Sequence, residues 1–159
     1  MTTMCAYDWT KGKTSQIAYI GTDFHIHEIY RAVGQKQPSF ADLTKWTGAP
    51  AVSTSTAMSG FEWVAGKSKH VVYTDDVGHI HELSCATNWT HADLFDGAHI
   101  ADSAHAAKAV VGRSISGFDW AAEGTKQIVY HGDNGSNESI QELSMYPAQF
   151  PMATPTCRN

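Results

Sequence analysis

Residues 69–83 read Lys-His-Val-Val-Tyr-Thr-Asp-Asp-Val-Gly-His-Ile-His-Glu-Leu, and this stretch decides the fold because the chain repeats it. Related stretches occupy residues 16–29 and 127–143. The tyrosines at the equivalent places are spaced by 54 and 57 residues: Tyr19, Tyr73 and Tyr130. Self-similarity at a nearly fixed period indicates a repeat architecture. The sequence therefore predicts three tandem copies of one small unit.

Two further residue types recur with the unit. A tryptophan precedes each copy, again at spacings of 54 and 57 residues: Trp9, Trp63 and Trp120. A glutamate lies near the end of each copy, at spacings of 54 and 60 residues: Glu28, Glu82 and Glu142. The three extra residues of the last spacing fall within residues 134–138, a turn where insertions are well tolerated. An insertion at that place is what a structural repeat predicts.

Each unit has the pattern of four short strands. In the second copy the apolar runs are Gly60–Val64, Lys69–Thr74, His79–Ser84 and Trp89–Phe95. The short breaks between them force antiparallel neighbours. Apolar side chains fall on both faces of these runs, which indicates that each sheet is buried between two others. A repeated four-stranded meander predicts an all-β protein, a β-propeller with three four-stranded blades in the chain.

We expect one repeat domain over residues 1–159, with irregular loops at 47–59 and 97–116 and a tail at 151–159. The blades are expected at approximately residues 5–46, 58–95 and 115–150.

Three blades do not close a ring, because propellers typically have four to eight. An open arc would leave two apolar faces in water. We therefore predict a homodimer that closes six blades. A fragment of a longer chain is the alternative.

Charge, apolar runs and cysteine content indicate which partners and which surroundings to expect for this protein. The net charge is −5 and Lys and Arg total 11 without clustering, so no nucleic-acid partner is expected. No run approaches 18 apolar residues, so no membrane span is expected. Residues 1–8 lack the pattern of a secretory signal, which predicts a cytoplasmic protein or one released by a non-classical route. Cys5, Cys85 and Cys157 are odd in number and far apart, which predicts reduced thiols.

The repeat resembles the six-bladed fucose-binding lectins of fungi and bacteria. The matching positions cover most of the unit: Val72-Tyr73, Gly78, Ile80, Glu82 and Trp89. The resemblance implies a carbohydrate-binding propeller with several sites between blades and with glycans, fucosylated ones among them, as ligands. Some bacterial members carry two repeats and build the ring by oligomerising, which agrees with the predicted dimer.

The resemblance also implies site residues. In those lectins an Arg, a Glu and a Trp hold the sugar, and the Glu is matched by Glu28, Glu82 and Glu142. The nearest aromatic candidates are Tyr30, Trp46 and Trp89. The Arg position holds an aliphatic residue in every copy: Ile17, Val71 and Ile128. The alternative is therefore a non-catalytic structural or protein-interaction propeller that has lost sugar binding.

Histidine pairs form a second candidate site. His25 and His27 share one face of a strand, as do His79 and His81, because side chains alternate. Two imidazoles at this spacing bind a transition metal only if a third ligand approaches. The third copy has Ser139 and Gln141 at these places, and the sequence shows no obvious third ligand. We therefore expect solvated or hydrogen-bonded histidines and no metal or cofactor, and a metal site at the two histidine pairs is the alternative.

Catalytic motifs do not occur in the sequence. We find no nucleophile elbow, no phosphate-binding loop and no zinc signature. Repeated sites suit multivalent binding, because linked weak sites gain avidity. The sequence therefore predicts a binding protein and not an enzyme.

Overall fold

The computed structural model describes residues 3–53, 55–95, 107–133 and 138–146, and it contains three antiparallel sheets. The first sheet consists of β1 (Met4–Trp9), β2 (Thr14–Ile20), β3 (Ile26–Ala32) and β4 (Ser39–Asp42). The second consists of β5 (Met58–Trp63), β6 (Ser68–Thr74), β7 (Ile80–Cys85) and β8 (Trp89–Asp93). The third consists of β10 (Ile115–Trp120), β11 (Thr125–Asp133) and β12 (Glu138–Met145), with β9 (Lys108–Ala109) beside β11.

The sheets form because each repeat carries strand-favouring residues between short turns. In the second sheet all four strands lie within two residues of their predicted bounds. Every residue of β6 is buried, which agrees with apolar side chains on both of its faces. Turn-forming residues end the strands. Between β6 and β7, for example, Gly78 has φ of +84°, a conformation that favours glycine. The predicted blade pattern is therefore confirmed.

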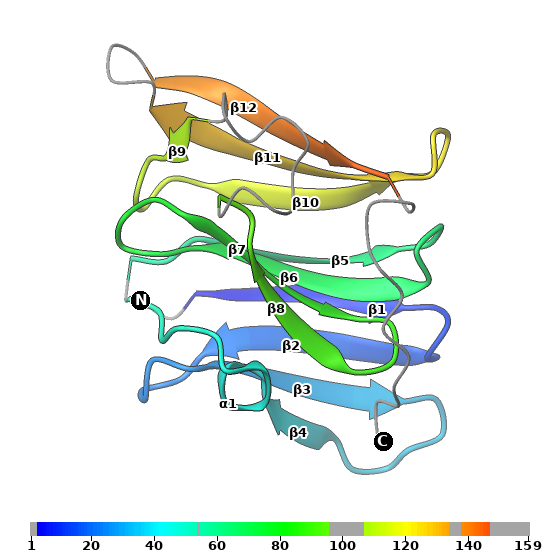
Figure 1. Cartoon of the computed structure of the whole chain (residues 1–159). Helices are drawn as coiled ribbons and strands as arrows, with labels where there is room; N and C mark the ends of the chain where they lie inside the picture. The colour runs from blue at the N-terminus through cyan, green and yellow to red at the C-terminus, as the bar shows by residue number, and fades with distance from the viewer. Residues whose placement is uncertain (1–2, 54, 96–106, 134–137, 147–159) are drawn as a thin grey trace.

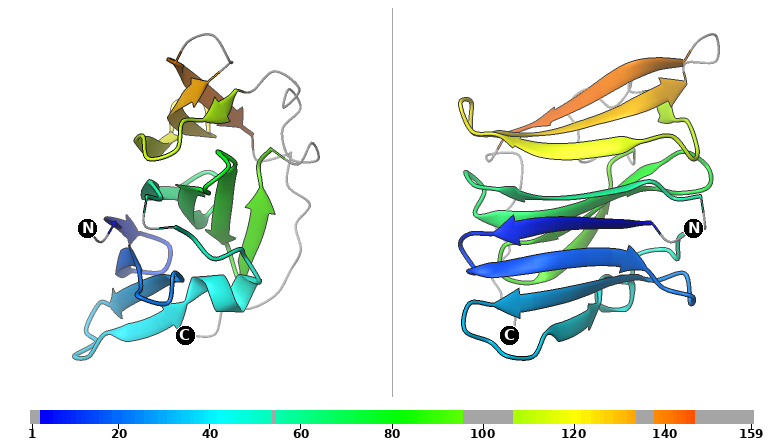
Figure 2. Two further views of the ribbon diagram at one scale, coloured as in Figure 1. Left: turned by 90° about the vertical axis from the view of Figure 1, so that its left-hand side faces the viewer. Right: turned by 180° about the vertical axis from the view of Figure 1, so that it is seen from behind.

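The three sheets lie face to face in chain order, with the second between the other two (Figures 1 and 2). Their first strands, β1, β5 and β10, lie next to one another. One apolar cluster joins the first two sheets around Ala18, Ile26 and Val71. A second joins the last two sheets around Val72 and Ile128. The core therefore consists of two boundaries between blades, which we call boundary 1–2 and boundary 2–3.

Two elements differ from the expected repeat. The third sheet receives its fourth strand from β9, which precedes the repeat, whereas β4 and β8 follow theirs. A short helix, α1 (Leu43–Thr47), forms just after β4. Asp42 caps it by accepting a hydrogen bond from the Lys45 amide at 2.9 Å, and Gly48 ends it in the left-handed conformation. Beyond α1 the connection to β5 is irregular, as predicted, while the tail 151–159 and residues 97–106 lie outside the described residues.

The structure also tests what the sequence predicts about the cysteines and about a membrane-spanning helix. Cys85 is disulfide-bonded, so the prediction of reduced thiols is wrong for this residue, whereas Cys5 is a free thiol. Among the described residues there is no helix with the length and apolar character needed to cross a membrane.

Candidate functional site

At boundary 1–2 the first candidate glutamate meets a lysine from the next sheet. Glu28 in β3 is buried, and its two carboxylate oxygens lie 2.8 and 3.0 Å from Lys69 Nζ in β6. Tyr7 in β1 donates a third hydrogen bond to the same carboxylate at 2.7 Å. Because a buried charge is costly without a partner, this pair satisfies both groups.

Aromatic rings surround the Lys69 ammonium. Its Nζ lies 4.8 Å from the ring centre of Trp89, 5.1 Å from that of Trp9 and 5.5 Å from that of Tyr30. Burial lowers the pKa of Lys69 more than its contact with Glu28 raises it. Three predicted site residues, Glu28, Tyr30 and Trp89, are thus brought together. The group at the centre of these side chains is the ammonium of Lys69, which belongs to the protein itself.

Boundary 2–3 repeats the arrangement. Lys126 Nζ in β11 lies 2.5 and 2.6 Å from the carboxylate oxygens of Glu82 in β7, and the ring of Trp63 is 5.4 Å from the same nitrogen. His70 Nδ1 lies 2.9 Å from Glu82. Burial by itself would raise the pKa of Glu82, but Lys126 and His70 outweigh it and hold that pKa far below its usual range.

The two lysines were missed in the sequence, although a signal existed. Both stand four residues before the repeated tyrosine, and the first unit has Ser15 at that position. Their partners belong to a different sheet, so spacing within one repeat does not reveal the pairing. The resemblance to the lectins implies a cation two residues later, where this chain has Val71 and Ile128.

The remaining predicted residues lie apart from these clusters. Glu142 in β12 is exposed, because it points away from the second sheet on the open face of the third. Trp46 lies on α1 with 55% of its surface exposed. The structure therefore gives the third glutamate a different environment from Glu28 and Glu82.

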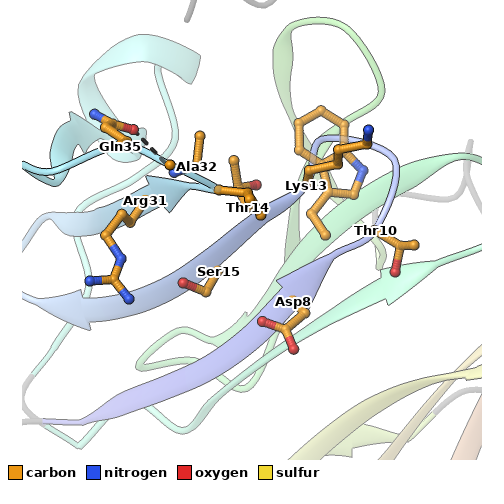
Figure 3. Close-up of a pocket in the computed structure, with 11 residues that line it drawn as sticks. Asp8, Thr10, Lys13, Thr14, Ser15, Arg31, Ala32 and Gln35 are labelled. Carbon is orange, nitrogen blue, oxygen red and sulfur yellow. Dashed lines mark hydrogen bonds between the residues drawn. The ribbon is translucent and has the colours of Figure 1, made fainter.

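The outward face of the first sheet carries a hollow of about 350 Å³. Asp8, Ser15 and Arg31 are direct neighbours across β1, β2 and β3, and they line it with residues of the strand ends (Figure 3). Ser15 occupies the place that Lys69 and Lys126 hold in the other sheets. A short hydroxyl side chain thus stands where the other boundaries have an ammonium.

The histidine pairs do have further partners. His27 Nε2 lies 3.0 Å from Asp23, and His25 Nδ1 lies 2.9 Å from Asp42. In the second sheet His79 contacts Asp93 at 2.9 Å and His81 contacts Asp75 at 3.2 Å. Asp23, His27 and Asp42 place their ligand atoms within 4.8 Å of one another, a spacing from which a metal ion could be held.

Comparisons with known proteins bear on the fold. No protein-family model matches the chain, and no curated protein is similar to it in sequence. Solved structures do match. The SapL1 lectin, solved with alpha methyl fucoside, has a TM-score of 0.58 and 15% identity over 92% of this chain and 48% of that one.

Two fungal structures give the same result. AofleA from Arthrobotrys oligospora matches with a TM-score of 0.57 and 14% identity, over 92% of this chain and 43% of its own. The Aleuria aurantia lectin, described as a six-bladed β-propeller with a novel mode of fucose recognition, has a TM-score of 0.58 and 13% identity over 91% and 45%. This chain spans about half the length of the structures that it matches. The predicted resemblance is confirmed at the level of fold, and the chain has the architecture of about half of a six-bladed β-propeller.

Proposed function

We propose that this protein is a carbohydrate-binding, lectin-like propeller. Its sugar site would lie at what we call the open boundary, where the outward face of the first sheet meets the outward face of the third sheet of a second copy of the chain. The observation that carries the proposal is the difference between Ser15 and its counterparts Lys69 and Lys126. At boundaries 1–2 and 2–3 an ammonium fills the space in front of the glutamate. At the outward face of the first sheet the corresponding space is a hollow.

Closure by a second copy follows from the two outward faces. On the third sheet Phe118, Trp120 and Ile140 are 43%, 44% and 63% exposed. Their counterparts at boundary 2–3 are buried: Phe61, Trp63 and Ile80. On the first sheet Ile17 is 44% exposed, whereas its counterpart Val71 is fully buried. Each open face thus has the apolar side chains of a blade boundary, and burying them against each other is favourable.

Closure would bring a new set of side chains together. Glu142 and Trp120 on the third sheet correspond to Glu28 and Trp9, the residues that flank Lys69. In the ring they would face the hollow, so that Glu142 meets Arg31 of the other copy. Arg31 is paired with Ser15 across β2 and β3, and its forked guanidinium suits both a carboxylate and sugar hydroxyls.

A sugar ring suits this set chemically. Sugars bind where an aromatic ring offers an apolar surface and a few polar groups fix the hydroxyls. Trp120 would supply the ring, and Glu142, Asp8 and Arg31 would supply acceptors and donors. A closed dimer would hold two such sites, which favours multivalent binding rather than chemistry at a single centre.

The test combines a broad glycan array with the solution mass of tag-free protein. The best glycan is then titrated against wild type, Glu142→Gln and Arg31→Ala. Glu138→Gln is the matched control, because Glu138 lies on the same strand and is exposed. We expect a mass of two chains and at least tenfold weaker binding for the first two variants, about 1.4 kcal/mol.

Two results would contradict the proposal. A dimer that retains no glycan on the array would favour a structural propeller without sugar binding. Wild-type affinity in both Glu142→Gln and Arg31→Ala would move the site away from the open boundary.

A further inference from the structure

Two aspartates and two histidines gather at the turn between β2 and β3, and the proposed sugar site does not use them. From their geometry we propose that Asp23, His27 and Asp42 bind a divalent transition-metal ion of the zinc class. The inference is independent of carbohydrate binding.

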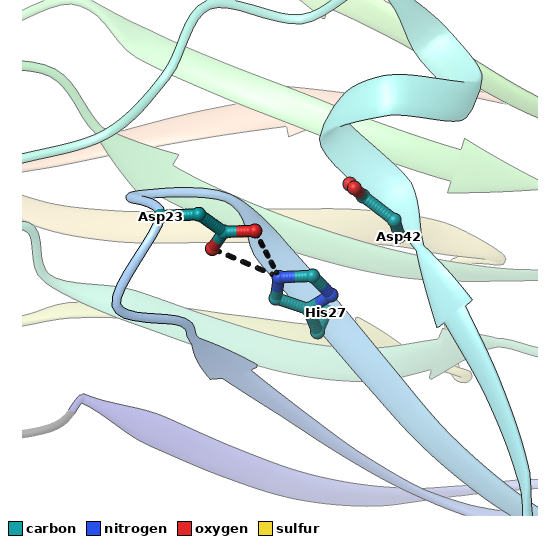
Figure 4. A group of neighbouring side chains, drawn as sticks. All are labelled: Asp23, His27 and Asp42. Carbon is teal, nitrogen blue, oxygen red and sulfur yellow. Dashed lines mark hydrogen bonds and ion pairs between the residues drawn. The ribbon is translucent and has the colours of Figure 1, made fainter.

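The donor atoms already lie close together. His27 Nε2 is 3.0 and 3.1 Å from the two oxygens of Asp23, and the donor atoms of Asp23, His27 and Asp42 all lie within 4.8 Å (Figure 4). Zinc binds nitrogen and carboxylate oxygen at about 2.0–2.2 Å, which spaces tetrahedral ligands by roughly 3.3 Å. Small rotations of the two carboxylates would close the remaining distance.

The backbone fixes these positions. His27 and Asp42 are direct partners in the pairing of β3 with β4, so both side chains project from one face of the sheet. Asp23 is held in its turn because its carboxylate accepts a hydrogen bond from the His25 amide at 3.2 Å. Rigid strands supply two ligands and a hydrogen-bonded turn supplies the third.

Gly21 makes room for the cluster. A Cβ at this position would lie 2.4 Å from the Asp23 carboxylate and 2.8 Å from His27 Nε2. Any side chain would therefore displace the proposed ligands. The glycine, whose φ is not in the left-handed region, is explained by the space that these two residues occupy.

The charge of the cluster suits a dication. Within the described part of the chain, every ion pair of Asp23 and Asp42 is to a histidine, and no lysine or arginine neutralises them. Because a histidine that binds a metal ion is neutral, the two carboxylates would set the charge of the site at −2, which one divalent ion would balance. Imidazole with carboxylate selects zinc and its neighbours over calcium or magnesium, which prefer oxygen alone.

His25 would act on the site indirectly, through its contact with Asp42. Its Nδ1 lies 2.9 Å from Asp42 Oδ2, a contact that would orient this carboxylate toward the ion. His27 would bind through Nε2, the nitrogen that faces Asp23, and would then carry its proton on Nδ1. With three protein ligands, a fourth position stays open to water.

The second sheet supplies a natural comparison. There His81 is engaged on both ring nitrogens, by His91 at 3.0 Å and by Asp75 at 3.2 Å, and it is buried. His79 contacts Asp93 as His25 contacts Asp42. Because the imidazole of His91 occupies one side of His81, we assign the site to the first sheet alone.

The test is calorimetric titration of tag-free, full-length protein with zinc chloride at neutral pH. Cobalt substitution provides a second readout, since its visible bands report coordination directly. We expect one equivalent of zinc per chain. His27→Gln and Asp23→Asn should bind at least tenfold more weakly. His79→Gln is the histidine control, because His79 lies on the second sheet at the place that His25 has on the first, and it should bind as wild type does.

Folding is checked by the unfolding midpoint of each metal-free variant. If His27→Gln does not fold, Asp42→Asn takes its place, because asparagine still caps α1. Equal zinc affinity in every variant would overturn the assignment, as would wild-type protein that gives neither heat nor cobalt bands at millimolar metal. No sugar takes part in these measurements, so their failure leaves the proposed function standing.

Discussion

Lys126 Nζ lies 2.6 Å from Glu82 Oε2, although the two residues belong to different sheets and both are buried. The same relation joins Lys69 to Glu28 at the preceding boundary. In each case the third strand of one sheet supplies the carboxylate and the second strand of the next supplies the ammonium. Each boundary inside the chain therefore combines an apolar cluster with one specific ion pair.

Removing one partner of this pair should be more harmful than removing both. Lys126→Met leaves the Glu82 carboxylate buried beside His70 and without its ammonium partner, and we expect a loss of about 3–5 kcal/mol in the free energy of unfolding. Adding Glu82→Gln should restore part of that loss, because no uncompensated charge remains. Urea unfolding measures both. The exposed pair Arg113–Glu138 is the control, and Arg113→Ala should cost less than about 1 kcal/mol. A loss of that size for Lys126→Met would contradict the prediction.

Stability should fall on acidification in two stages. Burial and the nearby Lys126 lower the pKa of His70, so the unfolded chain takes up a proton here first, as the pH falls through about 6.5. The pKa of Glu82 is also held below the ordinary glutamate value of 4.5, so its stabilising contribution is lost as the pH falls below that value. Urea unfolding between pH 8 and pH 3 should show both stages. His70→Gln should flatten the stage between pH 7 and pH 5, and an unchanged slope there would refute the assignment to His70.

The repeat made the fold predictable, whereas the partners across sheets were not. Strands such as β6 follow from local residue patterns, and the turns between them follow from Gly and Asp. The predicted bounds of the strands in the second sheet therefore lie within two residues of the observed ones. Lys69 pairs with a glutamate 41 positions away on another sheet, and no local pattern contains that information. Asp42 likewise reaches His25 only because β4 folds back beside β3. The helix α1 escaped prediction because a single turn depends on its caps rather than on periodicity.

The cage around Lys69 should accept another cation once the lysine is shortened. Lys69→Ala leaves the Glu28 carboxylate facing the rings of Trp9, Tyr30 and Trp89, an arrangement that attracts ammonium groups. We expect a destabilised protein whose melting temperature rises when ethylammonium is added. Lys36→Ala, at an exposed position, should not respond. Equal responses of the two variants would mean that the salt acts generally and that no cage exists.

At Gly60 and Gly117 an aromatic ring of the preceding sheet lies directly against the backbone, and this predicts that a blade boundary and an open face respond differently to a change of one methyl group. A Cβ at Gly60 would lie 2.3 Å from the Tyr7 ring, and one at Gly117 would lie 2.2 Å from Phe61. The corresponding residue of the first sheet is Ala6, on the open face. Gly60→Ala should therefore cost about 1–3 kcal/mol of unfolding free energy through overpacking. Ala6→Gly should cost no more than about 1 kcal/mol.

The same substitution tests closure of the ring by a second copy. If Phe118 of another copy lies against the first sheet as Phe61 lies against Gly117, the methyl group of Ala6 holds that ring away. Ala6→Gly should then strengthen self-association, which sedimentation over a dilution series measures as a lower dissociation constant. Trp120→Ala should weaken it, because this ring corresponds to the buried Trp63. A dissociation constant that neither substitution changes would show that the two open faces do not meet.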